Sequence, residues 1–107
     1  MALYEKRTYS IKVGQMPELV RLYKDEGWTA LEAGGFGKNL VGYFMSDTGR
    51  LHQLIHLWRF ENDEARRDFW KRLYANEAFM AFVVKIRPLI HTQEVQLLFP
   101  APWGPRP

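Results

Sequence analysis

The stretch LVGYFMSDTGRLHQLIHLWRF, residues 40–60, decides the fold. Its first part, LVGYFMSD (40–47), is rich in residues that favour β-strands, and DTGR (47–50) has the composition of a tight turn. The second part, LHQLIHLWRF (51–60), also fits a helical stripe, but the turn before it and the polar residues Asn62 and Asp63 after it favour a strand. We therefore predict a β-hairpin over residues 40–60.

The residues before the hairpin predict a strand and then a helix. In LYEKRTYSIKV (3–13), β-formers and charges alternate, which places one set of side chains on a common face: Leu3, Glu5, Arg7, Tyr9 and Ile11. Pro17 suits the first turn of a helix whose apolar stripe consists of Met16, Leu19, Val20 and Tyr23. Gly27 interrupts this stripe and Trp28 and Leu31 resume it, so we expect one bent helix or a helix followed by a second short turn.

The residues after the hairpin predict a helical region and a last strand. Asn62 or Asp63 can cap a first helical stretch and Asn76 a second one. This second stretch must end before Pro88, because proline disfavours helical geometry in the residue that precedes it. Apolar and polar residues alternate in TQEVQLLF (92–99), which predicts a fourth strand.

The predicted element order is therefore β, α, β, β, α, β, which is a ferredoxin-like α+β fold. Such a unit forms a four-stranded antiparallel sheet with two helical segments on one face. We expect one domain over residues 1–99 and a proline-rich C-terminal tail, PAPWGPRP, over residues 100–107, where four prolines exclude a sheet strand. The second face of the sheet is left open, so we expect a homodimer or a higher homo-oligomer.

Composition limits the class of protein. The 107 residues suffice for a single domain, and hydrophobic residues make up 47% and aromatic residues 15% of them, more than one small core needs. The net charge of +3 arises from interleaved basic and acidic residues rather than from a basic stripe, so we expect no nucleic-acid partner. The sequence has no cysteine, no apolar stretch of signal-peptide length and no apolar run long enough for a transmembrane helix. It therefore favours a cytoplasmic protein with no membrane partner.

Three blocks of the sequence resemble the NIPSNAP family, which is part of the dimeric α/β barrel superfamily. They cover about half of the chain and are YEKRTYSIKVG (4–14), LVGYFMSDTGRLHQLIHLW (40–58) and KIRPLIHTQEVQLLFPAPWGP (85–105). The resemblance implies a dimeric α/β barrel built from ferredoxin-like subunits. It implies no particular activity, since the family is known mainly as proteins of unknown biochemical role. The sequence departs from the family pattern at Asp47, Arg50 and His52, which cluster at the predicted hairpin turn.

The resemblance also emphasises chemically reactive residues on the predicted strands. A carboxylate, a guanidinium, phenols, an imidazole and an indole can together bind a small hydrophobic or anionic ligand and move protons. We therefore predict a candidate pocket formed by Glu5, Arg7, Tyr9, Tyr43, His56 and Trp58. In the alternative interpretation, Glu5 and Arg7 form an ion pair within the sheet or across a dimer, and His56 is a satisfied interface residue.

Three functional hypotheses follow from these residues and from the resemblance. The leading one is a small-molecule-binding homodimer of the NIPSNAP type. A second is a cofactor-independent monooxygenase or isomerase that acts on an aromatic or polyketide-like substrate, with Tyr9 or His56 managing protons. A third is a protein-interaction module.

The sequence predicts neither a metal site nor a cofactor. His52 and His56 would share one face of a helix, but on a strand they lie roughly 13 Å apart, at about 3.3 Å per residue, which is too far for one ion. His91 has no neighbouring acidic ligand in sequence. Residues 47–49 match the Asp-Thr-Gly of aspartic proteases, but Arg50 follows them and no glycine occurs between 49 and 104, so a turn is favoured.

Overall fold

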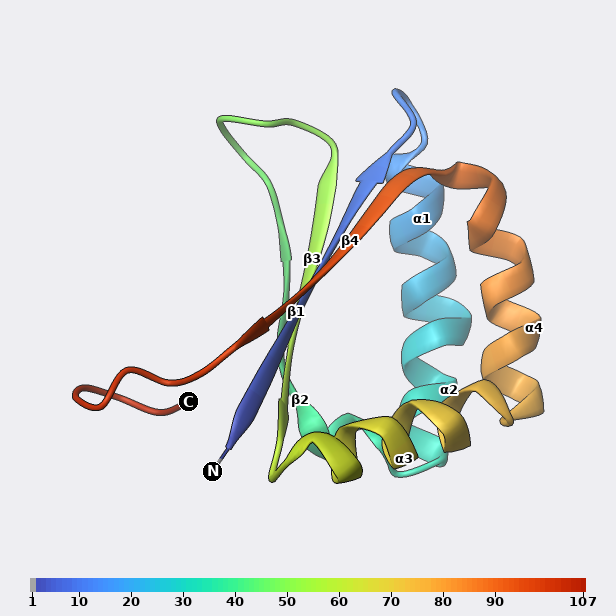
Figure 1. The fold of residues 1–107 in the computed structure, drawn as a ribbon. Coiled ribbons are helices and arrows are strands. Elements are labelled where there is room, and N and C mark those ends of the chain that lie inside the picture. Colours follow the sequence, from blue (N-terminus) through green and yellow to red (C-terminus); the bar gives the residue numbers. More distant parts are fainter. Residues whose placement is uncertain (1) are drawn as a thin grey trace.

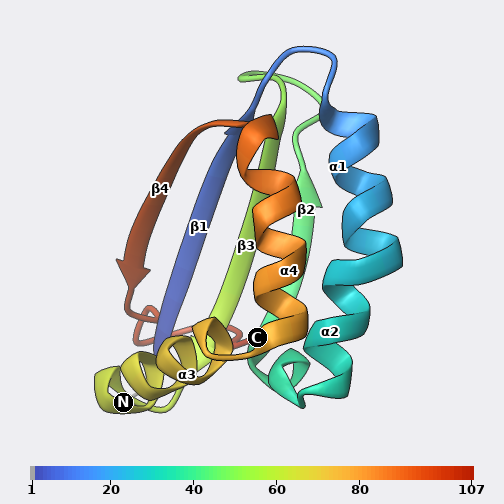
Figure 2. The same ribbon diagram turned by 90° about the vertical axis from the view of Figure 1, so that its right-hand side faces the viewer.

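The structure, a computed structural model that describes residues 2–107, confirms the predicted order of elements. One four-stranded sheet carries the helices on one of its faces (Figure 1 and Figure 2). The elements are β1 (Leu3–Ile11), α1 (Met16–Leu22), a π-helical segment (Tyr23–Gly27), α2 (Trp28–Ala33), a 3₁₀ segment (Phe36–Asn39), β2 (Leu40–Met45), β3 (Gln53–Phe60), α3 (Asp63–Tyr74), α4 (Glu77–Ile86), a 3₁₀ turn (Arg87–Leu89) and β4 (Ile90–Leu98). The fold is ferredoxin-like α+β.

The sheet has the strand order β2-β3-β1-β4, and each neighbouring pair is antiparallel. The ambiguous residues after the turn form β3, as predicted, because pairing with both β1 and β2 satisfies the backbone groups on both of its edges. Glu5 lies opposite Trp58, and Arg7 lies opposite His56. The side chains predicted to share one face of β1 therefore share the helix-covered face, which we call the inner face; the opposite one is the outer face.

Asparagine side chains cap both helices of the second half, as predicted. The Oδ1 atom of Asn62 accepts a hydrogen bond from the Ala65 amide at 2.8 Å, and Oδ1 of Asn76 accepts one from the Phe79 amide at 2.9 Å. In Figure 2, α4 runs along the sheet whereas α3 crosses one end of it. Within residues 2–107, no helix has both the length and the apolar character that crossing a membrane requires.

The first helical region is a continuous rod in which α1 and α2 are joined by the π-helical segment Tyr23–Gly27. The chain therefore forms one continuous helical region here, as in the first of the two interpretations, with a π-helical segment at the interruption rather than a second separate turn. Gly27 permits a close approach between this rod and α4, because a Cβ atom at Gly27 would lie 2.5 Å from Cζ of Phe82. π-helical turns are rare and frequently mark functional sites.

Several strand boundaries differ from the predicted ones: β2 ends at Met45 rather than at residue 47, β3 begins at Gln53 rather than at residue 51, and β4 ends at Leu98 rather than at residue 99. β1 ends at Ile11 rather than at residue 13, because the chain turns there and the Gln15 amide donates to the Lys12 carbonyl at 3.0 Å. β4 begins at Ile90 rather than at residue 92, because Ile90 still pairs with Ile11 across the sheet after a register shift.

The outer face of the sheet has no helix over it (Figure 1). Phe44, Ile55 and Leu57 form an apolar stripe on this face, and Phe44 is 54% exposed. β4 is exposed along most of its length. The residues after β4 form neither a helix nor a strand, and they turn back so that the Tyr4 hydroxyl donates to the Pro107 carbonyl at 2.6 Å.

Candidate functional site

The residues of the predicted pocket lie together on the inner face of the sheet. Strand register aligns them in adjacent rows, with His56 opposite both Arg7 and Tyr43, and with Trp58 opposite Glu5. Because alternate side chains of a strand project to the same face, these residues point toward the helices. β1 contributes Glu5, Arg7 and Tyr9, β2 contributes Tyr43, and β3 contributes His56 and Trp58.

The Glu5 carboxylate is fully buried and surrounded by donors. Its Oε2 atom accepts from Nη1 of Arg7 at 2.9 Å, so the two residues form an ion pair within one strand. Its Oε1 atom accepts from Nη1 of Arg66 at 2.8 Å and from the indole N–H of Trp70 at 3.1 Å. A buried carboxylate with this many donors is compensated in charge and in hydrogen bonding. Glu5 therefore anchors Arg7 and α3 rather than acting as a base.

The Arg7 guanidinium holds two tyrosines. Its Nε atom donates to the Tyr9 hydroxyl at 2.9 Å, and its Nη2 atom donates to the Tyr74 hydroxyl at 3.4 Å. Its Cζ atom lies 4.3 Å from the ring centroid of Trp70, a cation–π contact. With all three nitrogens engaged, Arg7 fixes the positions of the two phenols.

His56 is buried and neutral. Burial first, and then the positive charge of Arg7, lower the pKa of His56 to about 3. The indole N–H of Trp58 lies 3.4 Å from Nδ1 of His56 and can only donate, so Nδ1 is the acceptor nitrogen of the neutral ring. Nε2 then carries the proton and donates to the Tyr23 hydroxyl at 3.3 Å. This tautomer follows from the hydrogen-bond network.

Three tyrosine rings surround the imidazole of His56. Their ring centroids lie 4.9 Å (Tyr9), 6.0 Å (Tyr23) and 4.6 Å (Tyr43) from that of His56. Burial raises the pKa of all three phenols, and for Tyr9 it outweighs the opposing effect of Arg7. All three hydroxyls therefore keep their protons near neutral pH and can donate hydrogen bonds.

A cavity of about 150 Å³, which we call the inner cavity, lies between this cluster and the helices. Tyr9, Tyr43, His56 and Trp58 line it, whereas Glu5 and Arg7 lie outside its wall and support it. A cavity of roughly this volume in an apolar protein core is large enough for a benzene molecule. The remaining residues of its wall are Tyr23, Trp70, Tyr74, Phe79, Val83, Ile86, Arg87, Ile90 and Gln93.

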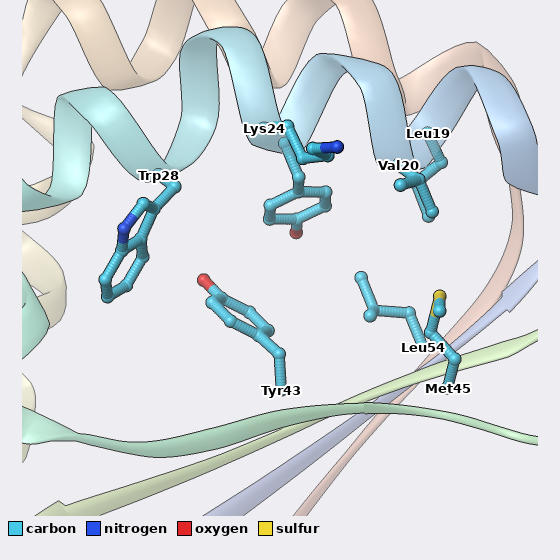
Figure 3. A pocket seen from close by; sticks show the side chains of 8 residues that line it. Leu19, Val20, Lys24, Trp28, Tyr43, Met45 and Leu54 are labelled. Carbon is cyan, nitrogen blue, oxygen red and sulfur yellow. The ribbon is translucent and has the colours of Figure 1, made fainter.

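A larger hollow of about 470 Å³, which we call the outer groove, lies between the first helical rod and the edge strand β2. Figure 3 shows the Tyr43 hydroxyl pointing from the sheet toward the rod, between Trp28 and Lys24. Tyr23 and Tyr43 line both hollows, so their rings separate the groove from the inner cavity. The rest of the groove is formed by Leu19, Val20, Lys24, Trp28, Met45 and Leu54.

Sequence reasoning missed the helical half of the site. Arg66, Trp70 and Tyr74 come from α3, and Tyr23 comes from the π-helical segment. Tyr23 was recognisable only as one member of an apolar stripe, a pattern that usually indicates core packing. No spacing in the sequence links Arg66 to Glu5, because the two residues are 61 positions apart.

The positions that depart from the family pattern lie away from both hollows. Asp47, Arg50 and His52 belong to the connection between β2 and β3, and none of them lines the inner cavity or the outer groove. His52 precedes β3 with a φ of +61°, and His56 lies within the strand. Within residues 2–107, no group of three or more His, Cys, Asp or Glu side chains is placed to hold a metal ion.

A comparison with solved structures shows which class of fold this chain has. An antibiotic biosynthesis monooxygenase matches 94% of this chain and 99% of its own chain with a TM-score of 0.63. Its sequence is 16% identical, so the likeness is one of fold alone. The two proteins share the βαββαβ order and the four-stranded antiparallel sheet of a ferredoxin-like α+β fold.

The chain belongs to the NIPSNAP family, whose sequence model matches residues 4–105. A solved NIPSNAP family protein from Agrobacterium tumefaciens is 30% identical with a TM-score of 0.89, over 96% of this chain and 89% of that one. Another from the same organism, described as of unknown function, is 34% identical with a TM-score of 0.88, over 97% and 92%. Human Protein NipSnap homolog 2 is 26% identical over 103 residues, which are 96% of this chain and 35% of the human protein. The chain thus spans about a third of the length of the curated relatives it matches.

Proposed function

We propose that this chain binds a small, mainly apolar molecule in the inner cavity and the outer groove. The observation that carries the proposal is that two hollows share Tyr23 and Tyr43 as a common wall within one chain, and that the neutral, buried His56 lines the inner one. Ligand sites are typically concave and apolar, with a few placed polar groups. Hollows of this kind favour a ligand-binding protein over a module that only contacts other proteins.

The same residues favour binding over proton-transfer catalysis. A monooxygenase or isomerase that works without a cofactor needs a group that exchanges protons near neutral pH. The pKa of His56 is lowered to about 3, and burial raises that of Tyr9, so both move away from neutrality. The carboxylate of Glu5, beside these residues, is already engaged by Arg7, Arg66 and Trp70.

A homodimer is the second part of the proposal. The apolar stripe of Phe44, Ile55 and Leu57 on the outer face would be covered by a second copy of the chain. The exposed β4 supports the same idea, because long uncovered edge strands favour association. Light scattering tests this part: we expect twice the chain mass of 12.7 kDa, and a monomer at micromolar concentration would contradict it.

Native mass spectrometry of the protein as purified from cells tests the binding proposal. We expect a bound species that is released on denaturation and is lost when Val20→Trp fills the outer groove. Val84→Trp is the matched control, because Val84 is 63% exposed on α4 and lines neither hollow. If the protein carries no ligand and a library of apolar molecules gives no thermal stabilisation, the binding proposal is wrong.

A further inference from the structure

Around the inner cavity, the hydroxyl protons of Tyr9, Tyr23 and Tyr74 have no hydrogen-bond acceptor among the hydrogen bonds of residues 2–107. The oxygens of Tyr9 and Tyr74 accept from one planar guanidinium, that of Arg7, and the oxygen of Tyr23 accepts from His56. Each hydroxyl also has one O–H bond, which cannot point toward a group that is itself donating. These three O–H bonds must therefore point elsewhere.

No protein acceptor takes these three protons within residues 2–107. The hydrogen bonds of Tyr9, Tyr23 and Tyr74 are those with Arg7 and His56 alone. All three tyrosines line the inner cavity. Raised pKa values keep Tyr9 and Tyr23 protonated, so these hydroxyls remain donors at neutral pH.

The inner cavity offers few acceptors for these protons: the amide oxygen of Gln93 is one, and the imidazole and the nearby carboxylate are already engaged. Both ring nitrogens of His56 are engaged, by Trp58 and by Tyr23. The carboxylate of Glu5 lies outside the wall and is saturated by donors. A molecule that brings an acceptor oxygen would satisfy the phenols, whereas one that brings only donors would find few partners.

Size and surroundings restrict the molecule further. The volume of about 150 Å³ suits one six-membered ring with a small substituent. The walls are mostly aromatic, which favours edge and face contacts with such a ring. The positive charge of Arg87, which lines the cavity, favours oxygens that carry partial or full negative charge.

We propose that the inner cavity binds a ring-sized group bearing a carbonyl or carboxylate oxygen, and that this oxygen accepts a hydrogen bond from at least one of the hydroxyls of Tyr9, Tyr23 and Tyr74. The proposal rests on the proposed small-molecule-binding function and gives the chemical class of the ligand. His56 is a positioning residue in this site: its Nε2–H fixes the oxygen of Tyr23 and turns the phenol proton away from the imidazole. Glu5 positions Arg7, which does the same for Tyr9 and Tyr74.

Isothermal titration calorimetry with four probes of similar shape tests the ligand class. Acetophenone and ethylbenzene differ by a carbonyl oxygen, and benzoate and benzylamine differ in presenting acceptors or donors. We expect acetophenone to bind about tenfold more tightly than ethylbenzene, since one hydrogen bond of roughly this strength is gained. Benzoate should bind and benzylamine should not; comparison of acetophenone with benzoate shows whether a carbonyl or a carboxylate is preferred.

Tyrosine variants locate the interaction. Tyr9→Phe and Tyr23→Phe keep the rings and remove the donors, so each should weaken acetophenone binding several-fold and leave ethylbenzene binding unchanged. Tyr4→Phe is the matched control, because Tyr4 lies on the outer face and its hydroxyl bonds to Pro107. The comparison of probes on the unmodified protein remains decisive if a variant does not fold.

Two outcomes would overturn the ligand class. If acetophenone and ethylbenzene bind equally well, the cavity binds small molecules but the phenols do not select an acceptor oxygen. If none of the four probes binds, the ligand class is also wrong, and native mass spectrometry of the purified protein then decides separately whether the chain binds another molecule.

Discussion

Stability between pH 7 and pH 5 should depend strongly on His56. The folded protein keeps this imidazole neutral, because burial and the charge of Arg7 lower its pKa to about 3. In the unfolded chain the pKa returns to the ordinary value of 6.5. Below pH 6.5 the unfolded chain therefore binds a proton that the folded protein does not, and stability falls as the pH falls.

The size of this effect follows from the two pKa values. The difference between 6.5 and about 3 corresponds to about 5 kcal/mol once both states are protonated. Of this, about 2 kcal/mol is lost between pH 7 and pH 5, and the loss continues until the pH passes the folded pKa near 3. A domain of this size has a total stability of about 5–15 kcal/mol, so the change is readily measured.

Urea unfolding at pH 7 and pH 5, at one protein concentration, measures the loss. Exposed carboxylates also titrate in acid, so the comparison that isolates the imidazole is between the unmodified protein and His56→Gln. The variant should lose about 2 kcal/mol less than the unmodified protein over this pH range. His91→Gln, at an exposed position of β4, should behave like the unmodified protein. Equal losses in the unmodified protein and in His56→Gln would refute a neutral, buried His56.

Three further substitutions test the packing of the fold and of the site. Glu5→Gln should lower the free energy of unfolding by about 3 kcal/mol in urea titrations, because Arg7 would lose its buried counter-charge. Gly27→Ala should lower it by about 1–3 kcal/mol although alanine favours helices, because its Cβ would lie 2.5 Å from the buried ring of Phe82. Leu57→Glu should convert the proposed dimer into a monomer in light scattering, because it adds a charge to the outer apolar stripe.

Each of these substitutions has a matched control. Glu61→Gln removes an exposed partner of Arg59 and should leave stability unchanged; a loss as large as that of Glu5→Gln would contradict the buried ion pair. A Cβ at Gly37 makes ordinary contact at 3.4 Å, so Gly37→Ala should cost less than Gly27→Ala, and the reverse order would refute the close approach of the helices. Val84→Glu lies on α4, away from the sheet, and should leave the dimer intact; a dimer that survives Leu57→Glu would place the interface elsewhere.

The element order was predictable because its signals are local. Alternation identified β1 and placed Glu5, Arg7 and Tyr9 on one face, which pairing with β3 confirms. The asparagine caps of α3 and α4 were visible as single residues before apolar stripes. The hairpin needed its flanking turn signals, since residues 51–60 alone fit two periodicities.

The arrangement of the candidate site was only partly predictable. Strand register places His56 between Arg7 and Tyr43, and no local pattern specifies that register. The contact of Glu5 with Arg66 depends on where α3 crosses the sheet, which is set by packing. Tyr23 enters the site at the start of a π-helical turn, and the apolar spacing of the sequence does not specify such a turn.

The sequence also did not predict which face of the sheet carries the candidate site. The predicted pocket residues could have lain on the open face, where a second subunit would cover them. They lie on the inner face, under α3, α4 and the first helical rod, so the two hollows are formed within one subunit. The proposed ligand site and the proposed dimer contact therefore lie on opposite faces of the same sheet.

A crystal structure of the protein soaked with acetophenone tests ligand binding in the inner cavity most directly. We expect the ring in the inner cavity, among Tyr9, His56 and Tyr74, with the carbonyl oxygen about 2.7 Å from a phenol oxygen. Acetophenone bound only elsewhere, with water alone in the inner cavity, would contradict both the location of the site and its preference for an acceptor oxygen.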